Sequence, residues 1–368
     1  MTLRVLFDSQ IFCAQQFGGI SRYFTSIARE MWQHQLVTAC VVAPWHVNEY
    51  AEHLPSGLLR GRRVALRYRP LARATSLLAG AVANVVKHPD IVHHTYYYPA
   101  PPVRRNTKRV LTVYDMTHER EPSTFSVRDP IARWKAAAVA SADHIICISH
   151  HTRRDLIELL GVAEHKISVT HLGYDELTPY PPADASTAAL ERPYLLFVGA
   201  RGGYKNFHAL LNAYARSPWL RAHFDLLCFG GGPFTSAEAD QIVALGVAAS
   251  VRQTGGADAA LAHGYQNAAM FVYPSRYEGF GIPPLEAMSL GCPVASSNAT
   301  SLPEVVGDAA ALFDPTDVDA MRETLEATLG SADALARLVV SGRQRSASFS
   351  WARCARETEA VYERITRS

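Results

Sequence analysis

Short apolar, β-branched runs alternate with segments of helical periodicity along almost the whole chain. This alternation predicts parallel sheets that are covered by helices on both faces. Five strands are predicted in the first half, near 4–7, 37–42, 90–93, 109–113 and 144–148. Five more are predicted in the second half, near 194–198, 225–229, 251–253, 270–273 and 293–296. We therefore expect two doubly wound α/β domains that bind ligands at the carboxyl ends of their strands.

A polar, proline-rich segment at 177–184 separates the two series of strands and is typical of an interdomain linker. The length of 368 residues also favours two domains over one. The predicted domains are 1–178 and 185–349, followed by a last helix within 350–366.

Composition is that of a soluble globular chain, with 48% hydrophobic and 19% charged residues. No apolar run approaches the eighteen or so residues of a membrane span, and the chain enters a strand at once, without signal-peptide organisation. We therefore expect a cytoplasmic protein. Six scattered cysteines without a C-x-x-C pair predict reduced core residues and neither a zinc site nor a disulfide framework.

The first half of the chain is the basic one. It contains 21 basic and 15 acidic residues through Tyr180, against 15 and 19 in the remainder. The basic residues are concentrated in two groups: Arg60, Arg62, Arg63, Arg67, Arg69 and Arg73, then Arg104, Arg105, Lys108 and Arg109. No nucleic-acid partner is expected, because no helix-turn-helix or RNA-binding motif accompanies them. Two interpretations remain open for these basic residues. They form a solvated surface, or they contact an anionic bilayer or a diphosphate-lipid acceptor.

The stretch 277–293 carries the most specific chemistry. Two prolines and a final glycine predict a helix from Pro284 to Leu290, with Glu286 in its first turn. Gly279 and Gly281 allow close approach of the backbone to a ligand, and the helix start favours an anion. Glu278, with seven residues between it and Glu286, adds a second carboxylate. A ligand in which a phosphate is joined to sugars would match both the anion site and the two carboxylates. The alternative is that no ligand is bound here, with Glu286 only stabilising the helix dipole and Glu278 exposed to solvent.

This stretch, with the preceding Tyr-Pro-Ser at 273–275, resembles the E-x7-E region of glycosyltransferase family 4, the retaining nucleotide-sugar transferases of the GT-B fold. The resemblance implies two Rossmann-like domains facing a central cleft and a C-terminal helix that crosses back to the first domain. It also implies that Glu286 binds ribose hydroxyls, that Glu278 binds the transferred sugar, and that the loop residues Gly279, Phe280 and Gly281 contact the donor.

Further second-domain motifs follow the same family pattern. Arg201 and Lys205, in the turn after the strand at 194–198, match the residues that hold the donor diphosphate, although their spacing is shorter than in many relatives. The alternative is two solvated loop cations. The loop at 253–258, including Ala257, matches the place where the nucleotide base meets backbone groups, so it does not separate guanine from uracil. Asp317 and Asp319 form a D-x-D at a predicted helix start, and no metal role is expected.

First-domain matches are looser. Gly18 and Gly19 match a turn that closes over the donor, and a plain strand-to-helix turn is the alternative. After the strand at 109–113 the family has a His-Asp pair; here Asp115 matches, Tyr114 replaces the histidine, and His118 follows three residues beyond Asp115. The segment 93–99 is predicted to line the acceptor pocket.

The resemblance predicts a retaining hexosyltransferase of cell-surface polysaccharide (lipopolysaccharide) synthesis that needs no prosthetic group or metal. GDP-mannose is the preferred donor, because the turn at 201–206 resembles that of bacterial polysaccharide mannosyltransferases. The expected acceptor is a saccharide or lipid-linked oligosaccharide, with peripheral contact to the inner membrane through the basic N-terminal domain. The alternatives are a UDP-sugar-dependent transferase, a sugar-nucleotide 2-epimerase and a noncatalytic nucleotide-sugar-binding protein; the oligomeric state is left open.

Overall fold

The computed structural model describes residues 2–101, 103–178 and 192–367. It divides the chain into two compact units, the first comprising Met1–Gly173 with Ser350–Ser368 and the second Tyr174–Phe349. Most of the predicted linker, 177–184, lies outside the described residues.

The first unit contains a seven-stranded, all-parallel sheet in the order β3-β2-β1-β4-β5-β6-β7. Its strands are β1 Arg4–Phe7, β2 Thr38–His46, β3 Leu59–Arg63, β4 Ile91–His94, β5 Lys108–Val113, β6 His144–Cys147 and β7 Ile167–Val169. Five of them lie where the apolar runs predict strands. The edge strands β3 and β7 were not predicted, because β3 is a mostly exposed Leu-Arg-Gly-Arg-Arg run and β7 has only three residues.

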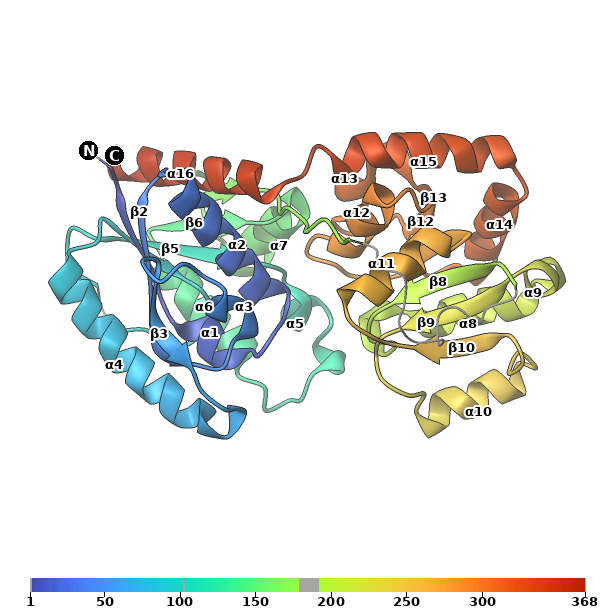
Figure 1. The fold of residues 1–368 in the computed structure, drawn as a ribbon, viewed down its shortest axis with the longest axis horizontal. Helices are drawn as coiled ribbons and strands as arrows, with labels where there is room; N and C mark the ends of the chain where they lie inside the picture. Colours follow the sequence, from blue (N-terminus) through green and yellow to red (C-terminus); the bar gives the residue numbers. More distant parts are fainter. Residues whose placement is uncertain (1, 102, 179–191, 368) are drawn as a thin grey trace. The chain divides into compact units, whose positions relative to one another are not determined.

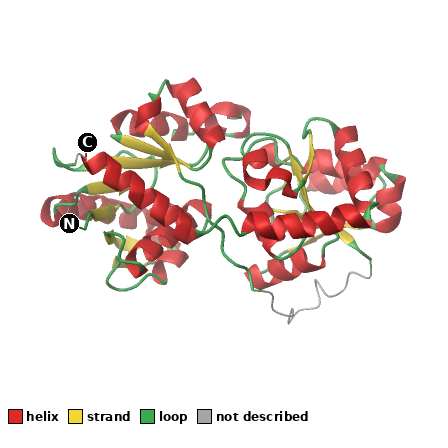
Figure 2. Ribbon diagram, turned by 90° about the horizontal axis from the view of Figure 1, so that it is seen from above, coloured by secondary structure: helices red, strands yellow, loops and turns green. Residues whose placement is uncertain are grey.

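Helices cover both faces of this sheet (Figure 2). They are α1 Gln10–Ala14, α2 Gly19–Gln33, α3 Glu49–Glu52, α4 Arg69–Lys87, α5 Thr117–Arg120, α6 Ile131–Ser141, α7 His150–Leu160 and α16 Trp351–Arg367, with 3₁₀ turns η1 Leu66–Tyr68, η2 Pro122–Thr124 and η3 Glu164–Lys166. The C-terminal helix α16 returns to this unit, as the resemblance implied. It is joined to β4 by a buried contact of 2.6 Å between Tyr362 OH and His93 Nδ1.

The second unit contains a six-stranded, all-parallel sheet in the order β10-β9-β8-β11-β12-β13. Its strands are β8 Tyr194–Val198, β9 Asp225–Phe229, β10 Val251–Thr254, β11 Met270–Tyr273, β12 Val294–Ser297 and β13 Ala311–Phe313. Its helices are α8 Phe207–Arg216, α9 Pro218–His223, α10 Ser236–Ala244, α11 Asp258–Asn267, α12 Ile282–Ser289, α13 Leu302–Val306, α14 Val318–Leu329 and α15 Ala332–Ser346, with 3₁₀ turns η4 Gly203–Lys205 and η5 Gly307–Ala309.

Both units are doubly wound, which confirms the predicted fold class. In each sheet the strand order reverses at the first strand of the unit: β1 lies between β2 and β4, and β8 lies between β9 and β11. Figure 1 shows β8 beside β9 in the second unit. Ligands of such sheets bind beyond the carboxyl ends of the strands at this reversal. Among the described residues, no helix is both long enough and apolar enough to cross a bilayer.

Candidate functional site

The glycine loop before α12 is a strained turn that requires glycine. Gly281 has a φ of +113°, and a Cβ atom there would lie 2.7 Å from Leu302 Cδ2. The helix begins at Ile282, two residues earlier than predicted, because prolines also fit the second and third helical positions, where the amide has no intrahelical partner. Glu286 is therefore the fifth residue of α12, and the prediction that it lies in the first turn is wrong.

Hydrogen bonds from the segment between β12 and α13 hold this loop in place. The Glu278 amide donates to Thr300 Oγ1 at 3.0 Å, and Ser301 Oγ donates to the carbonyls of Glu278 and Phe280 at 2.8 and 2.9 Å. The Phe280 ring is buried and packs edge-on against Phe349, with centroids 5.8 Å apart. The side chain of Phe280 thus anchors the loop in the core of the second unit.

Lys205 and Glu278 form an ion pair beside this loop. Lys205 Nζ lies 2.7 Å from Glu278 Oε1 and 3.4 Å from Tyr273 OH, and the two charged side chains are only 22% and 12% exposed. Burial by itself lowers the pKa of Lys205, but Tyr273 and Glu278 raise it by more, so the net pKa lies above the usual lysine value. The lysine therefore carries a permanent, partly desolvated positive charge.

Asn206 fixes the turn that carries Lys205. It adopts the left-handed conformation, with a φ of +59°, at the N-cap of α8. Its Nδ2 donates to the carbonyl of Pro274 at 3.0 Å and to that of Pro315 at 2.8 Å. Asn206 thereby joins the Lys205 turn to the segments that follow β11 and β13. The sequence offered one signal for it, an asparagine between a turn and a helix.

The Glu286 carboxylate is 5% exposed and faces Tyr265 of α11. Burial, followed by the nearby charge of Glu286, raises the pKa of the Tyr265 hydroxyl well above its usual value. Tyr265 was not predicted as part of the site, because only the tertiary fold brings α11 beside α12.

Arg201 is buried, and its guanidinium holds a second glycine turn. It donates from Nη1 to Gly230 O at 3.0 Å, from Nη2 to Pro233 O at 2.9 Å, and from Nε to Glu238 Oε1 at 2.9 Å. Gly230, Gly231 and Gly232 all have positive φ, so this turn is built from conformations that other residues rarely adopt. The contacts of Arg201 are those of a residue that shapes the turn, and direct diphosphate binding by it stays a prediction.

The predicted base-binding loop precedes α11. Ala257 occupies the N-cap of this helix and has no side-chain oxygen with which to cap it. Gln253 Nε2 donates to Thr254 O at 2.7 Å and contacts Gly230 O at 3.4 Å. The loop at 253–258 and the Gly230 turn are thus neighbours.

In the first unit, the Gly18–Gly19 turn leads into α2. Gly18 is the N-cap and accepts a hydrogen bond from Ser21 Oγ at 3.0 Å. A Cβ atom at Gly18 would meet Gln15 Oε1 at 2.7 Å, whereas one at Gly19 would meet nothing within 4 Å. The turn therefore has open space beside Gly19.

Asp115 and His118 lie around the short helix α5. Asp115 Oδ1 accepts the Thr117 amide at 2.9 Å, while the Asp115 carbonyl accepts Lys135 Nζ at 2.9 Å. His118 stacks on Phe125 with centroids 3.8 Å apart.

Lys135 was not predicted as part of the site. It is 1% exposed and pairs with Glu119 at 2.8 Å. A buried lysine is not recognisable from its neighbours in sequence.

Tyr114, which stands where the family has histidine, lies in the core. Its ring packs against Tyr23 and Phe24 at centroid distances of 5.7 and 6.2 Å, and its amide donates to Tyr97 OH at 3.2 Å. Burial raises the pKa of the Tyr114 hydroxyl well above its usual value.

The segment after β4 forms an aromatic hollow with arginines. The Arg73 guanidinium lies 3.6 Å from the Tyr98 ring centroid, and the Trp134 ring packs against Tyr98 with the two centroids 5.3 Å apart. A hollow of about 420 Å³ is lined by Arg69, Arg73 and Tyr98 among others. A neighbouring hollow of about 220 Å³ shares Tyr98 and adds Tyr96 and Trp134. Aromatic faces and guanidinium groups are suited to sugar rings and to anions.

A partly buried acid–base pair, Asp8 and His94, lies next to this segment. His94 Nδ1 is 2.7 Å from Asp8 Oδ2, and Asp8 Oδ1 accepts the Thr95 hydroxyl and amide at 2.6 and 3.0 Å. Burial raises the pKa of Asp8, but the bonds to His94 and Thr95 outweigh it and leave the pKa below the usual value. These bonds fix the backbone where β1 and β4 end.

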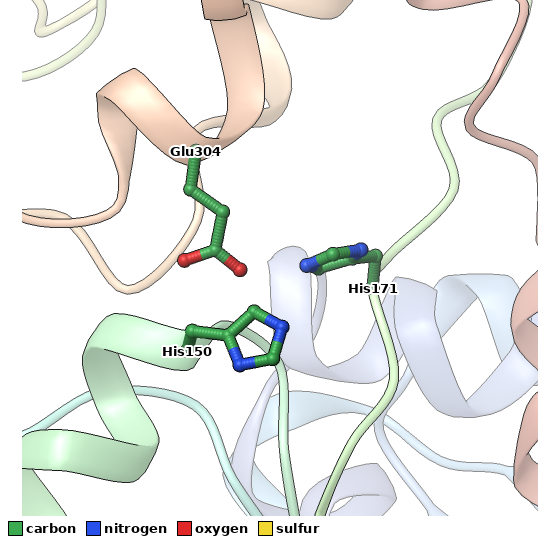
Figure 3. Close-up of side chains that lie close together, drawn as sticks. All are labelled: His150, His171 and Glu304. Carbon is green, nitrogen blue, oxygen red and sulfur yellow. The ribbon is translucent and has the colours of Figure 1, made fainter.

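Two further histidines, His150 at the start of α7 and His171 after β7, have their rings 5.8 Å apart at an angle of 75° (Figure 3). Glu304, also labelled in Figure 3, belongs to the second unit. Within either unit taken alone, the described residues contain no group of three histidine, cysteine or acidic side chains placed like metal ligands. Asp317, the first member of the D-x-D, caps α14 by accepting the amides of Asp319 and Ala320.

Two family profiles match this chain. "Glycosyltransferase Family 4" matches residues 17–176, and "Glycosyl transferases group 1" matches residues 183–345. O-antigen chain mannosyltransferase B of Escherichia coli is 31% identical over 288 residues, which is 74% of this chain and 74% of that protein.

Solved structures with the same architecture include sucrose-phosphate synthase from Thermosynechococcus elongatus, with a TM-score of 0.75, 18% identity and 99% of both chains covered. Anabaena Alr3699/HepE in complex with UDP and glucose has a TM-score of 0.71 and 17% identity, over 98% of this chain and 99% of that one.

Proposed function

The chain belongs to glycosyltransferase family 4, and from this premise we propose that it is a retaining mannosyltransferase that uses GDP-mannose in cell-surface polysaccharide synthesis. The relative from Escherichia coli is a mannosyltransferase by name, which supports the sugar. A UDP-sugar donor is the second candidate, because a structure of the same fold holds UDP.

The observation that carries the donor site is the partly buried Lys205 cation beside the Gly279–Gly281 loop. In our proposal Lys205 binds the donor diphosphate together with the amides of this loop and the start of α12. Glu286, deep in the same helix, accepts hydrogen bonds from the ribose hydroxyls. Glu278 binds the transferred hexose, and the 253–258 loop, including Ala257, contacts the base through its backbone.

The proposed reaction breaks the bond between the anomeric carbon and the diphosphate oxygen and forms a bond from that carbon to an acceptor hydroxyl oxygen on the same face. The departing phosphate accepts the hydroxyl proton, so no protein nucleophile is required. Lys205 stabilises the negative charge that develops on the leaving diphosphate, with the Gly18–Gly19 turn as a further source of amide donors. We assign no metal to this step.

Asp115 and His118 are proposed to lie near the reacting face of the transferred sugar. Lys135 then has a positioning role, since it holds the Asp115 carbonyl and pairs with Glu119. Tyr114 contributes to the core beneath them.

The first unit is proposed to bind the acceptor in the hollow of Tyr96, Tyr98 and Trp134. Aromatic faces suit sugar rings, and Arg69 and Arg73 at the adjoining hollow suit the phosphate of a lipid-linked oligosaccharide. The basic first unit is further proposed to contact the inner face of the membrane peripherally.

A thermal-shift panel of GDP, UDP, ADP and TDP with their sugars tests the donor, because a ligand that binds only the folded state raises the melting temperature. GDP and GDP-mannose should give the largest shifts, and Glu286→Gln should reduce them. Glu323→Gln, an exposed glutamate of α14, is the matched control. Product analysis by NMR then reports the anomeric configuration, and inversion or the absence of transfer would contradict the proposal.

A further inference from the structure

Helix α4 lies at the surface of the first unit (Figure 1). Several of its apolar side chains are exposed. Leu71, Leu78, Val82 and Val86 are 48%, 72%, 61% and 69% exposed. Their spacing places all four on one face of the helix.

The opposite face of α4 is packed against the sheet. Ser76 and Ala83 are buried, and Ser76 Oγ donates to the carbonyl of Trp45 in β2 at 3.0 Å. No charged residue occurs between Arg73 and Lys87. A surface helix normally turns its charged residues outward, so α4 is unusual in presenting an apolar face there.

The sequence around α4 is strongly cationic. No acidic residue occurs from His53 to Pro89, whereas seven basic residues do: Arg60, Arg62, Arg63, Arg67, Arg69, Arg73 and Lys87. Leu66 and Tyr68, just before the helix, are a further 49% and 45% exposed. We call the surface formed by Leu66, Tyr68, Leu71, Leu78, Val82 and Val86 the α4 face.

We propose that the α4 face docks this protein onto an anionic lipid bilayer, a deepening of the membrane contact in the proposed function, on which it rests. Apolar side chains with basic residues clustered before them match the acyl boundary and the negative headgroups together. Of these basic residues, Arg63 is already paired with Glu49 and Glu52, at 2.7 and 3.0 Å. A second copy of this chain fits less well, because a symmetric pairing through α4 would bring two like-charged surfaces together.

The same helix also borders the proposed acceptor hollow. The first two turns of α4 contribute Arg69, Pro70 and Arg73 to the hollow that Tyr98 lines. By helical periodicity these two arginines lie on the side of α4 away from the exposed apolar stripe. The docking surface and the acceptor hollow are therefore separate sides of one helix.

Cosedimentation with vesicles tests the proposal directly. The full chain should bind vesicles containing phosphatidylglycerol and phosphatidylethanolamine, should bind pure phosphatidylcholine weakly, and should lose affinity as salt is raised. Leu78→Glu/Val82→Glu should bind at least about tenfold more weakly, and Leu78→Ser/Val82→Ser should retain part of the affinity. Val243→Glu/Val340→Glu, which alters two exposed valines of the second unit, is the matched control and should bind as the unmodified chain does.

Circular dichroism and GDP-dependent thermal shifts establish that each variant is folded. Equal vesicle binding by Leu78→Glu/Val82→Glu and the unmodified chain would overturn the proposal. The proposal would also be overturned if the unmodified chain did not bind vesicles but self-associated in sedimentation velocity, and if this variant abolished that self-association. Vesicle binding without any glycosyl transfer would support the docking surface and contradict the proposed function. Failure of the docking proposal and failure of the proposed function are therefore distinguishable.

Discussion

Lys205 Nζ lies 2.7 Å from Glu278 Oε1, although 73 positions separate the two residues in sequence. The cation assigned to the leaving diphosphate is therefore already paired with the carboxylate assigned to the transferred sugar. Opposite charges at this separation and partial burial hold both side chains in one arrangement before any donor arrives. Loss of either partner should affect the other.

Replacing Lys205 with alanine should lower kcat/KM by about a hundredfold or more, because one preorganised donor to developing negative charge is worth about 3 kcal/mol. Steady-state kinetics with saturating acceptor measure the effect. Lys166→Ala removes an exposed lysine of the first unit and should leave the rate unchanged. A rate loss below about threefold in Lys205→Ala would exclude the assigned role.

Arg201 and Glu238 should behave as one unit. Because the guanidinium is buried among carbonyls of the Gly230–Pro233 turn, Arg201→Lys and Glu238→Gln should each destabilise the chain by about 3 kcal/mol. Urea unfolding of both single variants and the double variant gives their coupling energy. Arg221→Lys, at an exposed arginine of α9, controls for the substitution itself.

The kinetics of the same variants separate two roles for Arg201. If it acts only by shaping the turn, both single variants should lower kcat/KM by similar factors. A much larger loss in Arg201→Lys than in Glu238→Gln would instead support direct contact with the diphosphate.

Replacing Gly281 with alanine should abolish donor binding in the thermal-shift assay. A φ of +113° is strained for alanine, and the 2.7 Å approach of a Cβ atom to Leu302 Cδ2 requires the buried Leu302 side chain or the loop to move. Gly264→Ala lies within α11 of the same unit, where a Cβ atom would be 3.8 Å from Leu196 Cδ2. That variant should bind the donor normally, since alanine is favoured in helices. Equal donor affinities in the two variants would refute the strained-loop argument.

The sequence predicted the buried parts of the fold best. Strands such as β1 and β8 have the predicted bounds, because strands of a parallel sheet are covered on both faces and read as continuous apolar runs. The edge strand β3 was missed, since its arginines lie at the exposed margin of the sheet and resemble a solvated loop. The start of α12 was placed late, because the two prolines fit several positions of a first turn.

The site was predicted residue by residue but not as a set of contacts. Motifs indicated Lys205, Glu278 and Glu286 separately, while the ion pair between the first two depends on the packing of η4 against the loop after β11. Nothing local distinguishes a buried lysine such as Lys135 from an exposed one. Which face of α4 is covered is likewise set by the sheet beneath it and not by the helix's own periodicity.

The bond between His93 and Tyr362 leads to a prediction on pH. Burial, followed by the charge of His94, lowers the pKa of His93 to about 3, with Asp8 opposing the shift. The folded chain therefore holds this histidine neutral, whereas the unfolded chain takes up a proton below the ordinary value of 6.5. Stability is unaffected by His93 above that pH and falls by up to about 1.4 kcal/mol per pH unit as the pH drops from there towards the folded value.

Urea unfolding at a series of pH values from 7 to 4 measures this dependence. His93→Gln should lose about 1–3 kcal/mol at pH 7, because the buried hydroxyls of Thr112 and Tyr362 lose their contacts with the imidazole. Its stability should then fall less steeply with acid than that of the unmodified chain. Tyr362→Phe keeps the histidine and should keep the steep slope. His144, whose pKa burial and Arg364 lower to about 4, remains in every variant and cancels in the comparison. Identical slopes in His93→Gln and the unmodified chain would mean that His93 does not hold its neutral form in the fold.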